Sequence, residues 1–245
     1  MVKKKKFCET DLYPPIYDFL TKEGFLVKSE VRGCDVTAQK ENRLLIVEMK
    51  KSFQLSLVYQ AIERQSYCQE VFVAIPRPEK GQNTKQWKNM IKLLKRLGLG
   101  LFTVALDSPL HTVDVILEPK NSSMPKNNAK KQKLLLELEG RKGDYNVGGM
   151  TRRKVMTAYR ERALELCCIL QQQGEVSYGL LRRYGLLEKQ IKMLGTNVYQ
   201  WYKRVKKGVY CLSEEGKKAL GQEQYGDVVA YYKKKWSEKN NELIG

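Results

Sequence analysis

Two acidic residues and one lysine in the first part of the chain are of types that could carry out chemistry together. Asp35 lies in the segment GCDVTA, and Glu48 and Lys50 lie in the segment VEMKKS. Two carboxylates close together repel each other, and a hard divalent cation such as Mg²⁺ relieves that repulsion. A neighbouring lysine could orient or activate an attacking water, or stabilise negative charge on phosphorus. These residue types fit hydrolysis of a phosphodiester.

A hairpin would bring the three side chains to one face of a sheet. If Glu41 and Asn42 form a two-residue turn, counting outward along both strands places Asp35 opposite Glu48. Side chains in such a pair have Cβ atoms about 4.5–5.5 Å apart. Strand alternation keeps Lys50 on the face of Glu48 and turns the apolar residues between them to the other face. The alternative is a charged hairpin with an ordinary Lys–Glu pair, because Asp followed at a distance by Glu-x-Lys is a weak pattern.

The segments around this hairpin predict one mixed α/β domain over residues 7–118. Strands that alternate with helices indicate a central sheet with helices packed on it. Apolar neighbours place Glu48 in a mostly buried strand, where a carboxylate is unfavourable unless it is paired or binds a metal ion. Helices are expected over 11–23, 55–68 and 84–97, and strands over 25–31, 35–39, 44–50, 71–75, 100–105 and 113–117.

This order of elements, with Asp on the second strand and Glu-x-Lys on the third, resembles the PD-(D/E)XK nuclease superfamily. The resemblance implies an α/β (α+β) fold, a restriction-endonuclease-like mixed sheet flanked by helices. It also implies Mg²⁺, with Mn²⁺ as an alternative, held by Asp35 and Glu48, and it gives Lys50 the lysine position of the motif. Cys34 stands where proline often precedes the aspartate, which leaves the carboxylates intact.

Two further residues match positions seen in parts of this superfamily. Many members carry an acidic residue on the first helix, and Glu9 fits that role, with Asp11 as a substitute. Gln60, in YQAIERQ, resembles a helix glutamine that follows E-x-K in several branches; the alternative is a solvent-facing or capping amide. The resemblance therefore implies a catalytic set of Asp35, Glu48, Lys50, Glu9 and Gln60.

A narrower resemblance runs from about Glu9 to Leu220. Segments such as ETDLYPPIYDFL, VFVAIP, GLGLFTV, GDYNVGG and NVYQWYKRVKKGVYCLSEEG are similar to an uncharacterised bacterial family of PD-(D/E)XK-type phosphodiesterases. It implies a Mg²⁺-dependent nuclease that hydrolyses DNA phosphodiester bonds. Two alternatives stay open: a DNA-binding regulatory protein whose nuclease-like domain is catalytically silent, and an RNA-directed nuclease.

The excess of basic residues predicts a polyanionic partner. The chain has 45 Lys and Arg against 27 Asp and Glu, for a formal net charge of +18. Through Glu118 there are 19 basic and 14 acidic residues, and after it 26 and 13, so the second part carries most of the positive charge. Such a charge distribution favours nucleic acid, with an anionic membrane surface as the alternative.

Residues 150–222 are predicted to form a winged-helix-like nucleic-acid-binding domain, joined to residues 7–118 by a linker over 119–149. Helices are expected over 151–173, 176–185 and 187–204, followed by a strand over 207–213, a helix over 214–220 and a basic C-terminal helix within 223–245. GVYCLSEEG resembles the wing of such domains. A helix-turn-helix module places its second helix in the major groove, here 187–204. The expected nucleic-acid contacts are Lys189, Lys192, Lys203, Arg204, Lys206 and Lys207. The alternative is a small helical interaction domain with a solvated basic face.

Composition also excludes several chemistries and predicts a location. His111 is the single histidine, which excludes His-rich zinc sites and nucleases built on paired histidines. The six cysteines form no C-x-x-C pair and suit reduced thiols. Without a long apolar run or signal peptide, a cytoplasmic protein with no transmembrane segment is expected. Its expected partner is duplex or branched DNA, with RNA as the alternative, and a homodimer stays open because many nucleases of this type dimerise.

Overall fold

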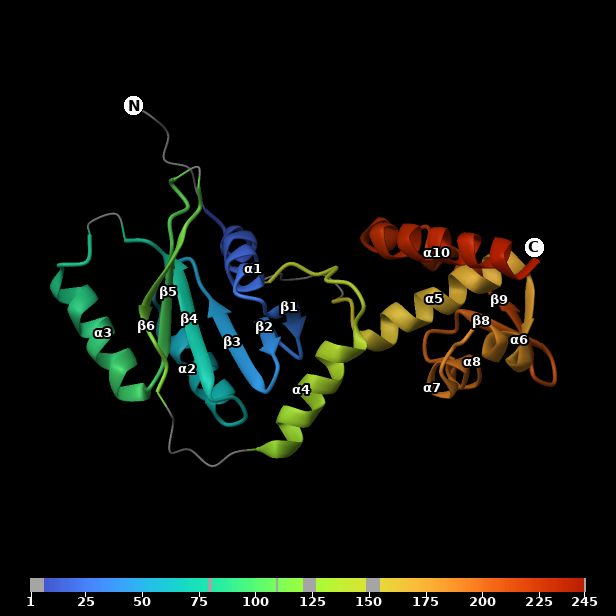
Figure 1. The fold of residues 1–245 in the computed structure, drawn as a ribbon, viewed down its shortest axis with the longest axis horizontal. Helices are drawn as coiled ribbons and strands as arrows, with labels where there is room; N and C mark the ends of the chain where they lie inside the picture. The colour runs from blue at the N-terminus through green and yellow to red at the C-terminus, as the bar shows by residue number, and fades with distance from the viewer. Residues whose placement is uncertain (1–6, 79–80, 109, 121–126, 149–154, 245) are drawn as a thin grey trace. The chain divides into compact units, whose positions relative to one another are not determined.

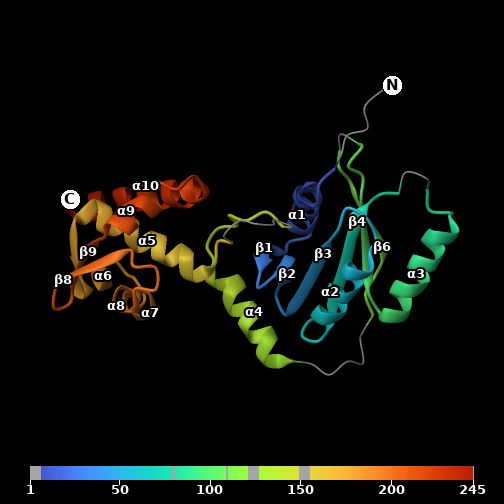
Figure 2. The same ribbon diagram turned by 180° about the vertical axis from the view of Figure 1, so that it is seen from behind.

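The chain folds into two compact units, Met1–Val155 and Met156–Gly245, each described by itself below. A computed structural model describes residues 7–78, 81–108, 110–120, 127–148 and 155–244, and Figures 1 and 2 show it from two sides. No helix of these described ranges combines the length and the apolar character that crossing a bilayer requires.

The first unit is built on a six-stranded mixed sheet in the order β1-β2-β3-β4-β5-β6 (Figure 1). The first three strands form an antiparallel meander, β3, β4 and β5 are parallel, and β6 is antiparallel to β5. The strands are β1 Leu26–Val31, β2 Cys34–Lys40, β3 Arg43–Met49, β4 Glu70–Pro76, β5 Gly100–Val104 and β6 Val113–Leu117.

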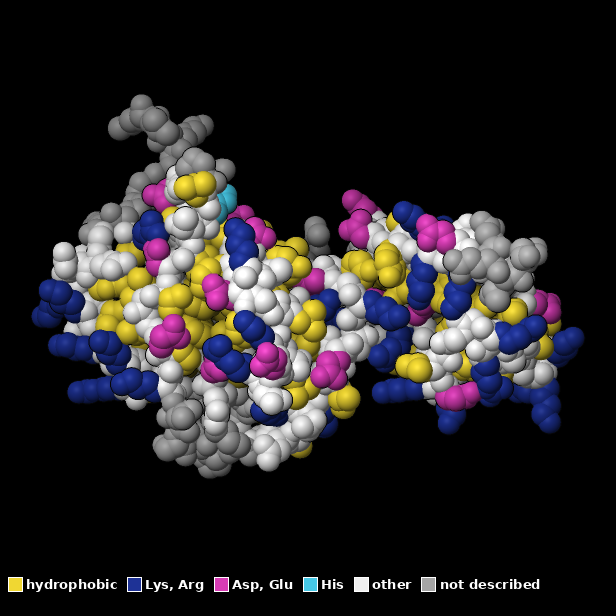
Figure 3. Space-filling view, viewed as in Figure 1, with side chains coloured by type: hydrophobic (Ala, Val, Ile, Leu, Met, Phe, Trp, Pro, Cys, Tyr) yellow, Lys and Arg dark blue, Asp and Glu magenta, His cyan; other side chains and the backbone are white. Residues whose placement is uncertain are grey.

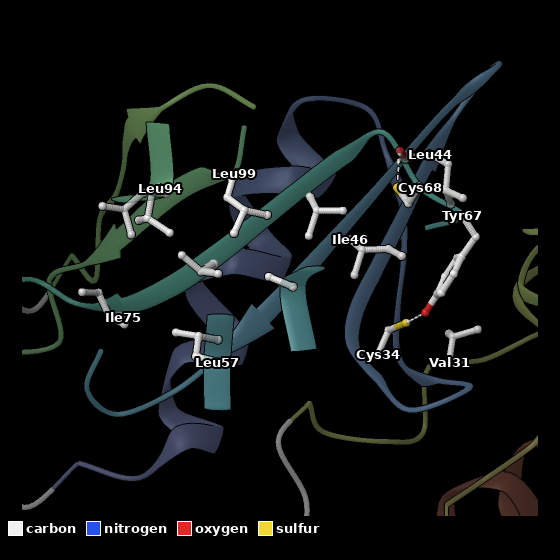
Figure 4. Packing of buried hydrophobic residues seen from close by; sticks show 14 of the residues in the cluster. Val31, Cys34, Leu44, Ile46, Leu57, Tyr67, Cys68, Ile75, Leu94 and Leu99 are labelled. Carbon is white, nitrogen blue, oxygen red and sulfur yellow. Dashed lines mark hydrogen bonds between the residues drawn. The ribbon is translucent and has the colours of Figure 1, made fainter. Parts of the chain in front are cut away.

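Helices cover both faces of this sheet, each over its own apolar cluster. One cluster combines α1 with residues such as Val47 and Met49, and the other combines α2, α3 and α4 with residues such as Ile46 (Figure 4). The predicted mixed sheet flanked by helices is confirmed. The helices are η1 Glu9–Leu12, α1 Tyr13–Lys22, α2 Leu55–Gln65, α3 Lys85–Leu97 and α4 Asn128–Gly140.

Local sequence explains where these helices begin and end. Pro14 and Pro15 occupy the first turn of α1, where a missing backbone N–H costs nothing. The Thr84 hydroxyl accepts a hydrogen bond from the backbone N–H of Trp87 and so caps α3, and Gly98 ends that helix at a φ of 67°, a left-handed conformation that suits glycine.

The described part of the segment predicted as a linker packs on the first unit. Leu134 and Leu138 of α4 are buried in the cluster beneath α2. Beyond α4, the buried Arg141 donates from Nη1 to the carbonyl oxygen of Ser29 at 2.8 Å, and Asp144 Oδ1 accepts from both the N–H and the hydroxyl of Ser29 at 2.9 Å. Residues 141–148 therefore form a strap held along β1.

The second unit contains a three-stranded antiparallel sheet in the order β7-β9-β8, with helices around it. A long buried helix, α5, begins at Thr157, whose side chain caps it by accepting from the backbone N–H of Arg160; the helix start predicted at Thr151 lies outside the described residues. The elements are α5 Ala158–Gln173, β7 Glu175–Ser177, α6 Tyr178–Arg183, α7 Glu188–Ile191, α8 Met193–Thr196, β8 Tyr202–Lys206, β9 Val209–Leu212, α9 Glu214–Leu220, η2 Glu223–Tyr225 and α10 Gly226–Ile244.

The single helix predicted over 187–204 is wrong. The structure has two helical turns, α7 and α8, and then the strand β8. Asn197, the residue after α8, takes a left-handed φ of 42° and ends the helix, and Gln200 takes a φ of 59° before β8 begins. The Asn197 amide fixes the turn, because it donates to the carbonyl oxygen of Tyr202 at 2.7 Å and accepts from the N–H of Tyr202 at 3.2 Å. Likewise, the helix predicted over 176–185 begins as strand β7.

The basic C-terminal helix, α10, docks firmly within the second unit. Tyr232 and Trp236 are buried, and the Tyr232 hydroxyl donates to Glu161 at 3.0 Å. Lys235 Nζ pairs with the buried Glu165 at 2.6 Å, and Glu165 also accepts from the amide of Gln190 at 2.7 Å. These contacts make α10 part of the unit's core.

Candidate active site

The hairpin of β2 and β3 has the register that its turn predicts. Lys40 pairs with Arg43 on either side of the two-residue turn, and the antiparallel pairing continues along both strands without a shift. One step beyond the last recorded pair, Asp35 lies opposite Glu48. The predicted register is confirmed, and it places both carboxylates at the same end of the hairpin.

Glu48 is fully buried, and half of its carboxylate is left without a hydrogen bond. Its Oε1 accepts from Arg64 Nε of α2 at 2.7 Å, whereas its Oε2 has no partner in the described part of the chain. Burial, together with the charge of Asp35, raises the pKa of Glu48 to about 8 despite the opposing effect of Arg64. A buried oxygen of this kind is unfavourable unless a cation or a proton meets it.

Arg64 is a member of this site that the sequence analysis did not single out. Its guanidinium also contacts the turn that precedes β2, where Nη2 donates to the carbonyl oxygen of Gly33 at 2.6 Å. Among the described residues of the first unit, the buried cations are Arg64, Lys28 and Arg141. Its only sequence signal is its position in YQAIERQ, one helical turn after Gln60.

Asp35 is held in place by the neighbouring strand. Its side chain is nearly buried, and its Oδ2 accepts from the backbone N–H of Met49 at 2.7 Å. Burial raises the pKa of Asp35, although this hydrogen bond and the charge of Lys50 act in the opposite direction. The carboxylate is therefore fixed beside Glu48 by the backbone itself.

Lys50 and Glu9 form an ion pair at the edge of this cluster. Lys50 Nζ lies 2.9 Å from Oε2 of Glu9, the first residue of η1. Burial lowers the pKa of Lys50, but Glu9 and the charges of Asp35 and Glu48 outweigh it, so the pKa is raised. Lys50 is therefore an ammonium group at neutral pH, suited to donate hydrogen bonds rather than to remove a proton.

The structure distinguishes the two acidic residues near the start of the chain. Asp11 Oδ2 accepts from the backbone N–H of Cys8 at 2.8 Å and so caps η1, which leaves Glu9 as the acidic residue at Lys50. Gln60 is half-buried on α2, and its Oε1 has no hydrogen-bond partner within the described ranges. Among the described residues, no recorded hydrogen bond joins Gln60 to Asp35 or Glu48.

The strap passes directly beside this hairpin. A Cβ on Gly148 would lie 2.7 Å from the carbonyl oxygen of Asp35 and 2.7 Å from Cε of Met49. Only glycine permits so close an approach to backbone. The glycine-rich end of GDYNVGG is the sequence signal for this contact.

The donor set can be compared with what different metal ions require. No group of three or more His, Cys, Asp or Glu side chains in the described residues is arranged to hold a metal ion. A structural zinc site takes four such ligands. Mg²⁺ is bound through one or two carboxylates together with waters and substrate phosphates. The pair of Asp35 and Glu48, with its unpartnered Oε2, fits this second pattern.

Comparisons with known proteins give one result. Neither the curated proteins nor the solved structures include a match to the chain. Residues 102–219 match the model of a protein family described as "Putative PD-(D/E)XK phosphodiesterase". The match begins in β5 and ends in α9, so the Asp35–Lys50 hairpin is separate evidence for the same class. Over residues 102–219, the chain is therefore similar to this family of PD-(D/E)XK phosphodiesterases.

Proposed function

We propose that this protein is a Mg²⁺-dependent phosphodiesterase that hydrolyses DNA phosphodiester bonds, with Asp35 and Glu48 as its metal ligands. The observation that carries the proposal is the buried, unpartnered Oε2 of Glu48 on the strand position opposite Asp35. Mn²⁺, which also prefers oxygen ligands, is the alternative cation. The family description supports the class of reaction.

Each residue of the cluster then has a distinct task. A divalent cation bound there would act as a Lewis acid on a phosphoryl oxygen. Lys50, held by Glu9, donates a hydrogen bond that orients the attacking water and stabilises negative charge on the phosphoryl group. Attack by the water forms a new bond to phosphorus and releases a proton to solvent, while the bond to the leaving oxygen breaks and that oxygen takes up a proton from solvent. Gln60, whose Oε1 lacks a partner among the described residues, is proposed to help position water.

The second unit is proposed to hold the nucleic acid. Its order of helix, strand, three short helices and a two-stranded hairpin supports the winged-helix-like interpretation. Figure 3 shows Lys and Arg side chains projecting from the surface of this unit. The six proposed contact residues are all exposed: Lys189 and Lys192 on and just after α7, Lys203, Arg204 and Lys206 on β8, and Lys207 in the turn that follows.

Metal affinity should depend on the protonation of Glu48. We expect Mg²⁺ to bind more weakly below the Glu48 pKa of about 8, with the affinity falling about tenfold for each pH unit, because the carboxyl group must lose its proton to bind a cation. Calorimetric titration with Mg²⁺ from about pH 6 to about pH 9 measures this dependence. An affinity that is constant across this range would contradict the role of Glu48.

The direct test of the proposed function is a cleavage assay on duplex, branched and single-stranded DNA and on RNA, with Mg²⁺ or with EDTA. We expect cleavage of DNA that requires Mg²⁺, and Lys50→Gln should slow it by about 10²-fold without weakening Mg²⁺ binding, since Lys50 acts on water and phosphate. Lys51→Gln, at the exposed neighbouring position, is the matched control.

The same assay separates the alternatives. Full cleavage activity in EDTA would show that the reaction does not require a divalent cation. DNA binding without cleavage of any substrate would indicate the catalytically silent regulator, and cleavage of RNA alone would indicate an RNA-directed nuclease.

A further inference from the structure

A small basic pocket lies next to the candidate active site in the first unit. It has a volume of about 110 Å³ and lies between the β1–β2 turn, α2 and α4. Its lining consists of three cations, one carboxylate, one phenol and one apolar side chain. These residues are Arg32, Arg64, Lys130, Glu63, Tyr67 and Leu134.

The charges that line this pocket are not balanced. Glu63 is its single carboxylate, and it lies 3.6 Å from Arg64 and 3.5 Å from Lys130. Arg32 has no hydrogen-bond or ion-pair partner in the described part of the chain, and its φ of 53° places it in a left-handed turn. This conformation is the one that a two-residue hairpin turn requires, and it holds Arg32 at the tip of the β1–β2 hairpin. Glu48 pairs with Arg64 from outside the lining, so the three cations of the pocket are matched by two carboxylates and keep a surplus of one positive charge.

Arg64 connects the pocket to the carboxylate pair. It lines the cavity while its Nε donates to Glu48 at 2.7 Å, so one guanidinium group separates the pocket from the candidate metal ligand. Tyr67 adds a hydroxyl, which lies 3.5 Å from Sγ of Cys34. A group bound in this pocket would therefore lie close to the reacting phosphate.

Size and donor geometry select the ligand class. Pockets for whole organic ligands have volumes of about 300–1,000 Å³, so this cavity fits a group the size of phosphate rather than a base or a nucleoside. Arginine forks match the oxygens of phosphate with paired hydrogen bonds, and lysine adds a point charge. A surplus of cations around so small a cavity favours an anion over a neutral group.

We propose that Arg32, Arg64 and Lys130 form a pocket that binds a phosphate group of the nucleic-acid substrate, next to the phosphate that is cleaved. This inference rests on the proposed function. It gives the first unit its own binding site for the nucleic-acid backbone, and this site does not depend on base sequence.

Salt dependence of DNA binding tests the pocket in the full-length protein. Affinity for a fluorescent DNA duplex is measured in EDTA at several salt concentrations, for the wild type, Arg32→Gln and Lys130→Gln. Each variant should lower the slope of log K against log salt by about 1, because one phosphate contact is lost. Lys92→Gln, on the exposed face of α3, removes the same charge elsewhere and should leave the slope unchanged.

Each outcome has a defined meaning. Equal slopes for the wild type and both pocket variants, or no DNA binding by the wild type, would overturn the proposal. Titration with inorganic phosphate distinguishes the source of the anion: phosphate binding that both variants weaken, without any change in the DNA slope, would assign the pocket to free phosphate and overturn its role with nucleic acid. Failure of the wild type to cleave DNA while the slopes still fall would overturn the proposed function alone.

Discussion

Glu48→Gln is expected to lower Mg²⁺-dependent cleavage by about 10³-fold while the protein remains folded. The amide oxygen of glutamine can still accept the hydrogen bond from Arg64 that Glu48 accepts at 2.7 Å. It carries no charge, however, and so it cannot replace the carboxylate as a ligand of a hard cation. The measurement is the initial rate of DNA cleavage at saturating Mg²⁺, with the thermal unfolding of both proteins recorded beside it.

The choice of glutamine matters because of Arg64. Glu48→Ala would leave the guanidinium of Arg64 without its buried partner, and breaking a buried ion pair in this way costs about 3–5 kcal/mol of stability. A lower cleavage rate of the alanine variant could therefore come either from unfolded protein or from the loss of the metal ligand. Asp35→Asn is the parallel variant on the opposite strand.

Glu23→Gln provides the matched control, since Glu23 is exposed at the end of α1. Its cleavage rate should equal that of the wild type. If Glu48→Gln and Asp35→Asn both kept the wild-type rate, the carboxylate pair would have no part in the reaction.

The hairpin could be predicted from the sequence because a single local feature determines it. Once Glu41 and Asn42 form the two-residue turn, the pairing of every later residue follows, and alternation assigns each side chain to a face. The positions of the strands and helices along the chain were similarly accessible, because buried strands and amphipathic helices have different periods. Local patterns therefore sufficed for the fold and for the position of Asp35 opposite Glu48.

Arg64 and the strap could not be predicted in this way, because their roles depend on contacts between distant segments. An arginine on an amphipathic helix has the pattern of a solvated residue, and only the packing of α2 on β3 brings it to Glu48. The strap has a loop-like composition, yet Arg141 and Asp144 anchor it to residues more than 100 positions earlier. Sequence spacing carries no information about such pairs.

The error over residues 187–204 has a different cause. Apolar residues recur there at helical intervals, but the segment ends its second helical turn at Asn197, which adopts a left-handed conformation and bonds to Tyr202. Asparagine tolerates that conformation better than most residues. The correction moves Lys203 and Arg204 from a recognition helix to a strand, and with them the expected mode of DNA contact.

The hairpin of β8 and β9 is therefore the proposed main phosphate-binding element of the second unit. Replacing its four exposed cations together with glutamine should lower DNA affinity by about 10²-fold at physiological salt and reduce the salt slope by about 4, since each cation releases counterions from the phosphate backbone. The positions changed are Lys203, Arg204, Lys206 and Lys207.

A rival explanation of these charges is available, because β8 is an edge strand of its sheet. Lysines on an edge strand also prevent pairing with other chains, without any ligand. The two explanations differ in their outcome. Loss of edge protection would produce aggregation at unchanged DNA affinity, whereas loss of phosphate contacts would weaken DNA binding by a protein that stays soluble as a monomer or dimer.

A control variant distinguishes local contact from overall charge. With four exposed cations of α3 changed to glutamine, it has the same net charge as the β8–β9 variant and should bind DNA with nearly the wild-type salt slope. Its positions are Lys88, Lys92, Lys95 and Arg96.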